Sequence, residues 1–361
     1  MGLSLGAYDE PVEGRLQDAG GWHAVLATIA DGGDLGERTA RLAMREVLAG
    51  EATDAQIAAF AMALRMKGET VNELVGLVRG MLDVAVPLEI PDDAVDIVGT
   101  GGSIERRAHA LNVSTMASFV AAAAGAIVCK HGNYRASSTS GAFDFLAELG
   151  IRVDLPAEAI TDCVRSLRIG FAPAPMFHPA MRRAAPVRRE VGIPTVFNIL
   201  GPLANPGRPR RQLVGTANEQ IAARIAEVFQ RLGSEHAWVV SGAGGLDEIA
   251  TIGPSIVYAV TPQGVRRVEL DVRDVGIVPP SSTLELAGGS PADNVRHFRA
   301  ILDGSDSGPR RDLVALNAGA ALVVAGVADG LADGIRRARL ALEDGSVQRL
   351  VDAVCTFTKQ A

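Results

Sequence analysis

The stretch that decides the fold is Asp96-Ile97-Val98-Gly99-Thr100-Gly101-Gly102-Ser103. A short apolar run that ends in closely spaced glycines is typical of a strand entering a tight turn. Without a Cβ, the backbone N–H groups of such a turn can approach an anion. Downstream, Asn112-Val113-Ser114-Thr115 opens an apolar helical pattern, and a helix N-terminus offers free N–H groups and partial positive charge. Together the two segments predict a phosphate-binding strand, turn and helix.

A second polar loop supports this interpretation, because a glycine cluster alone is more often only a tight turn. Lys130-His131-Gly132-Asn133 follows another short apolar run, and Ser137-Ser138-Thr139-Ser140-Gly141 then leads into a further helical pattern. Two anion-competent loops at neighbouring strand ends are what a site in an open α/β sheet requires.

The flanking sequence predicts an α/β protein with a small all-helical domain and a larger domain built on a mainly parallel central sheet. From Trp22 to Val84 apolar residues recur at helical spacing, and Thr53 with Gln56 and Thr70 with Glu73 form capping-box patterns. We expect an N-terminal extension over residues 1–20, a helical domain over 21–90 and an α/β domain over 91–361.

The α/β part alternates short apolar runs with longer helical ones. The predicted strands are Val95–Val98, Ala126–Cys129, Ile151–Val153, Leu213–Gly215, Ala237–Ser241 and Ile256–Val260. The predicted helices include Ser114–Ala124, Asn218–Leu232 and Ser290–Leu302, the last with Pro291 at its first position.

Composition excludes several classes of protein. The formal charge of −7 argues against general binding to nucleic acid, which needs an excess of Lys and Arg. Three cysteines without CxxC spacing indicate reduced thiols rather than disulfides or a zinc site. The start carries no signal-peptide pattern and no apolar stretch is long enough for a bilayer, so we expect a cytoplasmic protein without membrane contact.

In combination, G-T-G-G, N-x-S-T, K-H-G-N and S-S-x-S-G resemble the motifs of anthranilate phosphoribosyltransferases and, more distantly, of pyrimidine nucleoside phosphorylases. Further matching segments are 52–56, 67–70, Phe177-His178-Pro179, Val187-Arg188-Arg189, 197–203 and Gly245-Leu246-Asp247-Glu248. The resemblance implies a site in the cleft between the two domains, a homodimer formed through the helical domain, and part of residues 179–200 folding back onto that domain.

The resemblance also implies the role of each site residue. The donor, phosphoribosyl diphosphate, would be bound by Gly99, Gly102, Ser103, Asn112, Ser114, Thr115, Lys130, Ser137, Ser138 and Ala142. The acceptor, an aromatic acid such as anthranilate, would be bound by Gly99, His131, Asn133, His178, Arg188 and Pro202. Mg²⁺ would be held by Ser114, Asp247 and Glu248, and Lys130 and Arg188 would be the catalytic residues.

The implied reaction needs no protein nucleophile, because the acceptor amine attacks the anomeric carbon of the ribose as diphosphate leaves. Several residues also have structural interpretations. His178 is more readily a hydrogen-bonded structural histidine than a base, and Asp247-Glu248 alone would indicate a solvated turn.

The sequence departs from the family on the donor side. Ser103 stands where the family has Asp, Ala110 stands where it has Thr, and the intervening loop is longer and carries Arg106 and Arg107. Tyr134 follows Asn133 and displaces the usual arginine to Arg135. Alternatives are therefore a relative acting on another aromatic acid or sugar-phosphate donor, and a non-catalytic binding protein. Phosphorolysis of nucleosides is disfavoured because Arg188 matches the anthranilate branch.

Overall fold

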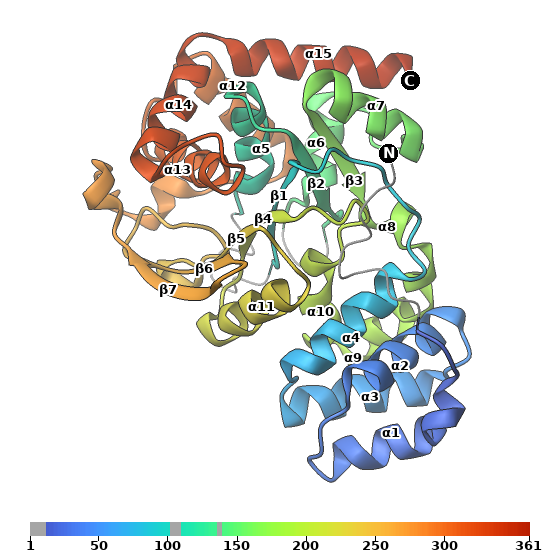
Figure 1. The fold of residues 1–361 in the computed structure, drawn as a ribbon. Coiled ribbons are helices and arrows are strands. Elements are labelled where there is room, and N and C mark those ends of the chain that lie inside the picture. Colours follow the sequence, from blue (N-terminus) through green and yellow to red (C-terminus); the bar gives the residue numbers. More distant parts are fainter. Residues whose placement is uncertain (1–11, 102–109, 136–138) are drawn as a thin grey trace.

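The computed structural model describes residues 12–101, 110–135 and 139–361, and it places a bundle of helices beside a sheet that is covered by helices (Figure 1). The bundle begins with α1 (Gly21–Ala30), α2 (Glu37–Ala49), α3 (Asp54–Lys67) and α4 (Val71–Leu82). Thr53 and Thr70 cap α3 and α4 by accepting from Gln56 N and Glu73 N at 3.3 Å each. The side chains of Gln56 and Glu73 return the bond to the capping residue, which confirms both predicted capping boxes.

The sheet has seven strands in the order β3-β2-β1-β4-β5-β6-β7. The strands are β1 (Val95–Gly99), β2 (Val128–Gly132), β3 (Ile169–Pro173), β4 (Arg211–Gly215), β5 (His236–Ser241), β6 (Ser255–Thr261) and β7 (Gly264–Leu270). β1 to β5 pair in parallel and the last two strands are antiparallel. β1 lies between β2 and β4, so the chain order reverses there, and ligands bind at such points beyond the carboxyl ends of the strands.

The predicted strands are mostly confirmed, and one is wrong. Ile151–Val153 forms no strand, although its backbone is tied to the C-terminal helix by Arg152 N, which donates to Thr358 Oγ1 at 3.2 Å. Its apolar residues pack beneath helices instead of joining a ladder. β2 begins two residues later than expected, and β3 and β7 were not predicted.

Helices line both faces of the sheet. One face carries α5 (Val113–Ala123) and the C-terminal helices α12 (Pro291–Leu302), α13 (Pro309–Val324), α14 (Leu331–Glu343) and α15 (Ser346–Gln360), which surround a core that includes Phe119, Phe145 and Phe298. The other core joins α11 (Glu219–Arg231) to the bundle and to Val98 and Val214 of the sheet. Three further helices are α6 (Ala142–Leu149), α7 (Ala157–Leu167) and α8 (Ala174–Phe177).

Two short helices from the middle of the chain lie within the bundle. α9 (Ala185–Val191) and α10 (Val196–Leu200) both contact α3, and Figure 1 shows them in green beside the blue N-terminal helices. Buried Val187, Val196 and Leu200 share one apolar core with the bundle. The domain boundaries at residues 20 and 90 stay a prediction.

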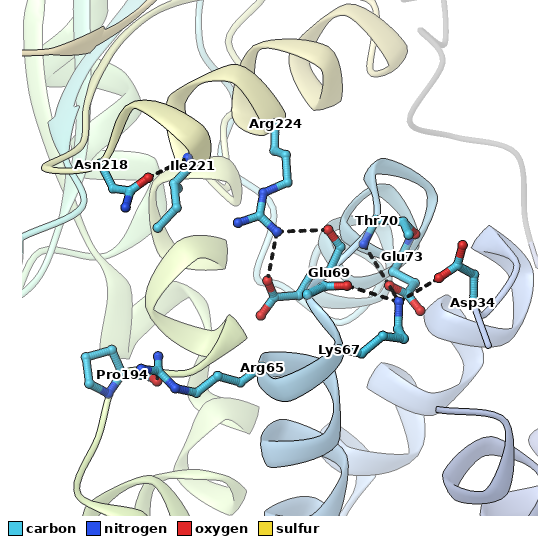
Figure 2. A network of polar contacts seen from close by, with 11 residues as sticks. Asp34, Arg65, Lys67, Glu69, Thr70, Glu73, Pro194, Asn218, Ile221 and Arg224 are labelled. Carbon is cyan, nitrogen blue, oxygen red and sulfur yellow. Dashed lines mark hydrogen bonds and ion pairs between the residues drawn. The ribbon is translucent and has the colours of Figure 1, made fainter. Parts of the chain in front are cut away.

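Polar contacts fasten the bundle to the α/β part (Figure 2). Arg224 of α11 donates to Glu69 O at 3.0 Å and lies 3.3 Å from its Oε2. Inside the bundle, Arg65 of α3 donates to Pro194 O at 2.5 Å, and Lys67 pairs with Asp34 at 2.7 Å and with fully buried Glu73 at 3.0 Å. Because Arg224 contacts Glu69, the turn between α3 and α4 joins the two parts.

No helix among the described residues is both long and apolar enough to span a membrane.

Candidate active site

The centre of the site is a crossing of backbones at the ends of β1 and β4. Gly99 and Gly215 pair in register there. A Cβ on Gly215 would lie 1.7 Å from Asp247 O, and one on Gly99 would lie 2.4 Å from Asp247 Oδ2. Only glycine therefore lets the Asp247–Glu248 turn lie directly across the two strand ends, and this turn brings the Asp247 carboxylate to the glycine loop.

The turn and the loop are held together by specific hydrogen bonds. Gly101, at φ +64°, donates its N–H to Asp247 Oδ2 at 2.9 Å, and Thr100 N donates to Gly215 O at 2.8 Å. On the far side, buried Asn317 of α13 accepts from Ile249 N and donates to Ile249 O, both at 3.0 Å. Two independent supports thus fix the segment that carries Asp247 and Glu248.

The N-terminus of α5 faces the same edge of the sheet, because α5 follows the glycine loop. Asn112 precedes the helix, and Ser114 and Thr115 lie in its first turn. Thr115 is 1% exposed, and its Oγ1 has no hydrogen-bond partner in the described part of the chain. A buried hydroxyl without a partner at the start of a helix is suited to an oxygen-rich anion or a cation.

A buried charge pair lies beneath the loop. Lys130 is 2% exposed and its Nζ donates to Ile97 O at 2.5 Å. Burial lowers the pKa of Lys130 to about 8, against the attraction of Asp96 and Asp247. Burial raises the pKa of Asp96 to about 6, although Lys130 and a 2.9 Å bond from Asn205 Nδ2 favour its charged form. Lys130 therefore supports the strand end from below, and its contact with a donor stays a prediction.

Two histidines lie at the expected acceptor side. The rings of His131 and His178 meet edge to face with centroids 5.4 Å apart. His178 Nε2 lies 2.7 Å from Ala204 O, which fits the structural interpretation of this residue, and burial lowers its pKa. Burial, followed by the nearby charges of His178 and Lys130, lowers the pKa of His131 to about 3, so its ring is neutral. Its Nε2 has no partner among the described residues.

Arg188 comes from α9 and is oriented by an aromatic ring. Its Cζ lies 5.7 Å from the ring centroid of buried Phe197, and burial lowers its pKa. Pro202 is buried in the short 3-10 helix Gly201–Leu203, which follows α10. Asn133 is exposed and uses its Oδ1 to accept from Tyr134 N at 2.8 Å.

Some predicted residues lie outside the described part of the chain. These are Gly102, Ser103, Ser137 and Ser138, together with the long loop that carries Arg106 and Arg107. Ala142, a predicted donor contact, is the first residue of α6. The donor and acceptor roles of all the site residues stay predictions.

Family models cover both parts of the chain. Residues 23–85 match the helical bundle domain of a glycosyl transferase family, and residues 91–348 match its a/b domain. An anthranilate phosphoribosyltransferase from Chloroflexus aggregans is 46% identical over 327 residues, which span 90% of this chain and 95% of that protein. The chain belongs to the anthranilate phosphoribosyltransferase family. A family member from Rhodococcus jostii is 45% identical over 91% of each chain.

Solved structures of family members have the same fold. The anthranilate phosphoribosyltransferase of Thermus thermophilus matches with a TM-score of 0.87 and 37% identity, over 93% of this chain and 99% of that one. The Saccharomyces cerevisiae protein, solved in complex with PRPP (phosphoribosyl diphosphate) and Mg, matches with a TM-score of 0.86 over 96% of this chain and 99% of that one. Its identity of 23% makes this second match evidence for the fold alone.

Several residues that shape this family site were not singled out by the sequence. Gly215 looked like the end of an ordinary strand, and Asp96 like the polar start of an apolar run. Asn205 donates to both Asp96 Oδ2 and Cys129 O, but it lies in a proline-rich loop where the sequence does not indicate which residues it contacts. The sequence did contain a signal for Asp96 and Asn205, because both are polar residues among apolar ones. Such a residue is buried only when it has hydrogen-bond partners, so a polar contact could have been expected at each.

Proposed function

We propose that the protein transfers the phosphoribosyl group of phosphoribosyl diphosphate to the amine of anthranilate and releases diphosphate. The observation that carries the proposal is the Asp247–Glu248 turn lying across the glycine ends of β1 and β4. That turn carries two carboxylate residues at the ends of the strands, and hard oxygen ligands of this kind suit a metal–diphosphate. Membership of the family supports the choice of acceptor.

On the donor side, the diphosphate would occupy the glycine loop and the start of α5, with Asn112, Ser114 and Thr115 as contacts. Ser114, Asp247 and Glu248 would hold Mg²⁺, because hard oxygen ligands suit this cation and substrate phosphates complete its coordination. The buried Thr115 Oγ1, which no described residue hydrogen-bonds, fits such an oxygen-rich site. When bound, Mg²⁺ supplies charge neutralisation for the departing diphosphate.

On the acceptor side, Arg188 would bind the carboxylate of anthranilate through its planar pair of donors, with Phe197 holding the guanidinium in place. His131 is uncharged and its Nε2 can accept a hydrogen bond, so it can face an amine without adding positive charge. Asn133 and Pro202 would complete the acceptor side. Positioning of the amine against the anomeric carbon then contributes much of the catalysis.

The direct test is turnover by the purified protein with phosphoribosyl diphosphate, anthranilate and Mg²⁺. We expect loss of anthranilate fluorescence and equal release of diphosphate and phosphoribosyl anthranilate, measured by mass spectrometry. Parallel reactions with other aromatic acids and with pyrimidine nucleosides plus phosphate serve as comparisons. Turnover of another acid in place of anthranilate would reassign the acceptor, and binding of the donor without turnover of any acid would indicate a non-catalytic protein.

We propose further that the protein is a cytoplasmic homodimer that associates through its helical bundle, as the resemblance implies. Sedimentation equilibrium of the purified chain tests this assembly, and a monomer at micromolar concentration would contradict it.

A further inference from the structure

Asn294 of α12 reaches the start of the phosphate-binding helix from a distant part of the chain. It is fully buried, and its Nδ2 donates to Asn112 Oδ1 at 2.7 Å and to Ala110 O at 2.9 Å. Its own Oδ1 accepts from Gly289 N at 3.1 Å. The residue therefore connects α12 to the segment that enters α5.

The backbone fixes which way the Asn294 amide points. The carbonyl of Ala110 can only accept and the N–H of Gly289 can only donate, so the two ends of the Asn294 amide cannot be exchanged. A Cβ on Gly288 would lie 2.4 Å from Asn294 Oδ1 and 2.5 Å from Ala110 O. Glycine at this position thus lets the two segments approach closely enough for these bonds.

The orientation of Asn294 in turn fixes that of Asn112. Asn112 Oδ1 accepts from Asn294 Nδ2 and from Ser140 Oγ, each at 2.7 Å. Both donors face its oxygen, so its Nδ2 must lie on the opposite side. Within the described residues, Nδ2 makes only one long contact, 3.5 Å to Ser140 O. Among the residues that the structure describes, at least one of its two N–H donors therefore has no partner and can bind an anion.

We propose that Asn294 is a positioning residue, which holds the amide of Asn112 with its N–H groups turned toward the phosphates of the donor. The inference rests on the proposed function, since it assigns the donor side of the same site. An Asn112 amide turned the other way would present its oxygen to a phosphate and repel it.

The test measures the dissociation constant of phosphoribosyl diphosphate at saturating Mg²⁺ by calorimetry, for the wild type and Asn294→Ala. We expect binding about fivefold to tenfold weaker in the variant, as for the loss of one hydrogen bond that orients a donor. The KM for anthranilate should stay within about twofold, because Asn294 has no contact on the acceptor side. If Asn294→Ala does not fold, Asn294→Ser provides a smaller polar side chain with the same expected loss.

Val295→Ala is the matched control, because Val295 is a buried neighbour in α12 whose side chain packs in the apolar core. It should lower the free energy of unfolding without changing donor affinity. A double-mutant cycle with Asn112→Ala then separates positioning from structure. If Asn294 acts through Asn112, its effect on donor affinity disappears in the Asn112→Ala background.

The outcomes distinguish this inference from the proposed function. Failure of the wild type to bind phosphoribosyl diphosphate would overturn both. Binding by the wild type with unchanged affinity in Asn294→Ala would overturn the inference alone. Additive effects of Asn294→Ala and Asn112→Ala would also overturn it, since they would show that Asn294 does not act through Asn112.

Discussion

The carbonyl oxygen of Asp247 lies only 1.7 Å from the position that a Cβ on Gly215 would occupy. Two backbones that meet this closely leave no room for adjustment by a side chain, because the contacting atom is part of the main chain. The placement of the carboxylate pair therefore depends directly on the absence of a side chain at the end of β4.

Gly215→Ala should displace the Asp247–Glu248 turn and weaken binding of Mg²⁺ and phosphoribosyl diphosphate by at least about tenfold, as expected when a site is misplaced by about 1 Å. Calorimetry measures this effect. Gly36→Ala is the control, since Gly36 has ordinary negative φ and nothing within 4 Å of an added Cβ. Equal affinities in the two variants would show that the crossing does not set the site.

Arg188→Lys should raise the KM for anthranilate about tenfold or more and leave the KM for phosphoribosyl diphosphate unchanged. An ammonium cannot form the paired bonds of a guanidinium with a carboxylate, and it loses the stacking on Phe197. Steady-state kinetics with each substrate varied in turn measures the split. The exposed neighbour Arg189 provides the control Arg189→Lys, and a similar change in both variants would contradict a specific carboxylate contact.

Asp247→Asn should increase the Mg²⁺ concentration needed for half-maximal activity by about tenfold, because the amide oxygen carries no charge. The amide can still accept from Gly101 N, so the glycine loop should keep its shape. Titration of Mg²⁺ into chelator-treated protein measures the effect. Asp274→Asn, at an exposed position, is the control, and an unchanged Mg²⁺ requirement in Asp247→Asn would exclude Asp247 as a ligand.

Acid should destabilise the fold through His131, whose pKa is lowered by burial from its ordinary value of 6.5 to about 3. Between these values the unfolded chain binds a proton that the folded chain does not, so this residue's stabilising effect is present above pH 6.5 and is lost as the pH falls. From pH 7 to pH 5 the loss is about 2 kcal/mol in the free energy of unfolding. Urea denaturation of the wild type and His131→Gln measures it, and equal pH dependence in both proteins would refute it.

The sequence predicted best those features that depend on neighbouring residues, such as helix caps. Thr53 and Thr70 cap helices within their own segments, whereas an apolar run such as the one ending at Gly99 forms a strand because distant segments pair with it. β3 was not predicted because Gly170 interrupts its apolar run. A Cβ there would lie 2.4 Å from Val164 Cγ2, so the glycine serves the approach of α7. β7 was not predicted because Arg266 and Arg267 are consecutive exposed residues, and they break the alternation of apolar and polar residues in this edge strand.

The sequence motifs of the site were predictable, whereas the distant residues that hold those motifs in place were not. The N-x-S-T motif places polar groups at the start of α5 and the K-H-G-N motif places them at the end of β2, and that much follows from spacing. Asn294, by contrast, is 182 residues from Asn112, and nothing in its helix reveals which distant amide it orients. Partners of this kind are set by tertiary packing.

The late position of Asn294 and Asn317 has a consequence for synthesis on the ribosome. A nascent chain that ends at Ser290 already contains the glycine loop, the start of α5 and the Asp247–Glu248 turn, and it contains neither asparagine. The amide that orients Asn112 and the amide that holds Ile249 both arrive with the C-terminal helices. We therefore expect full affinity for the donor only after the C-terminal helices have been synthesised, later than the N-terminal helices and all seven strands.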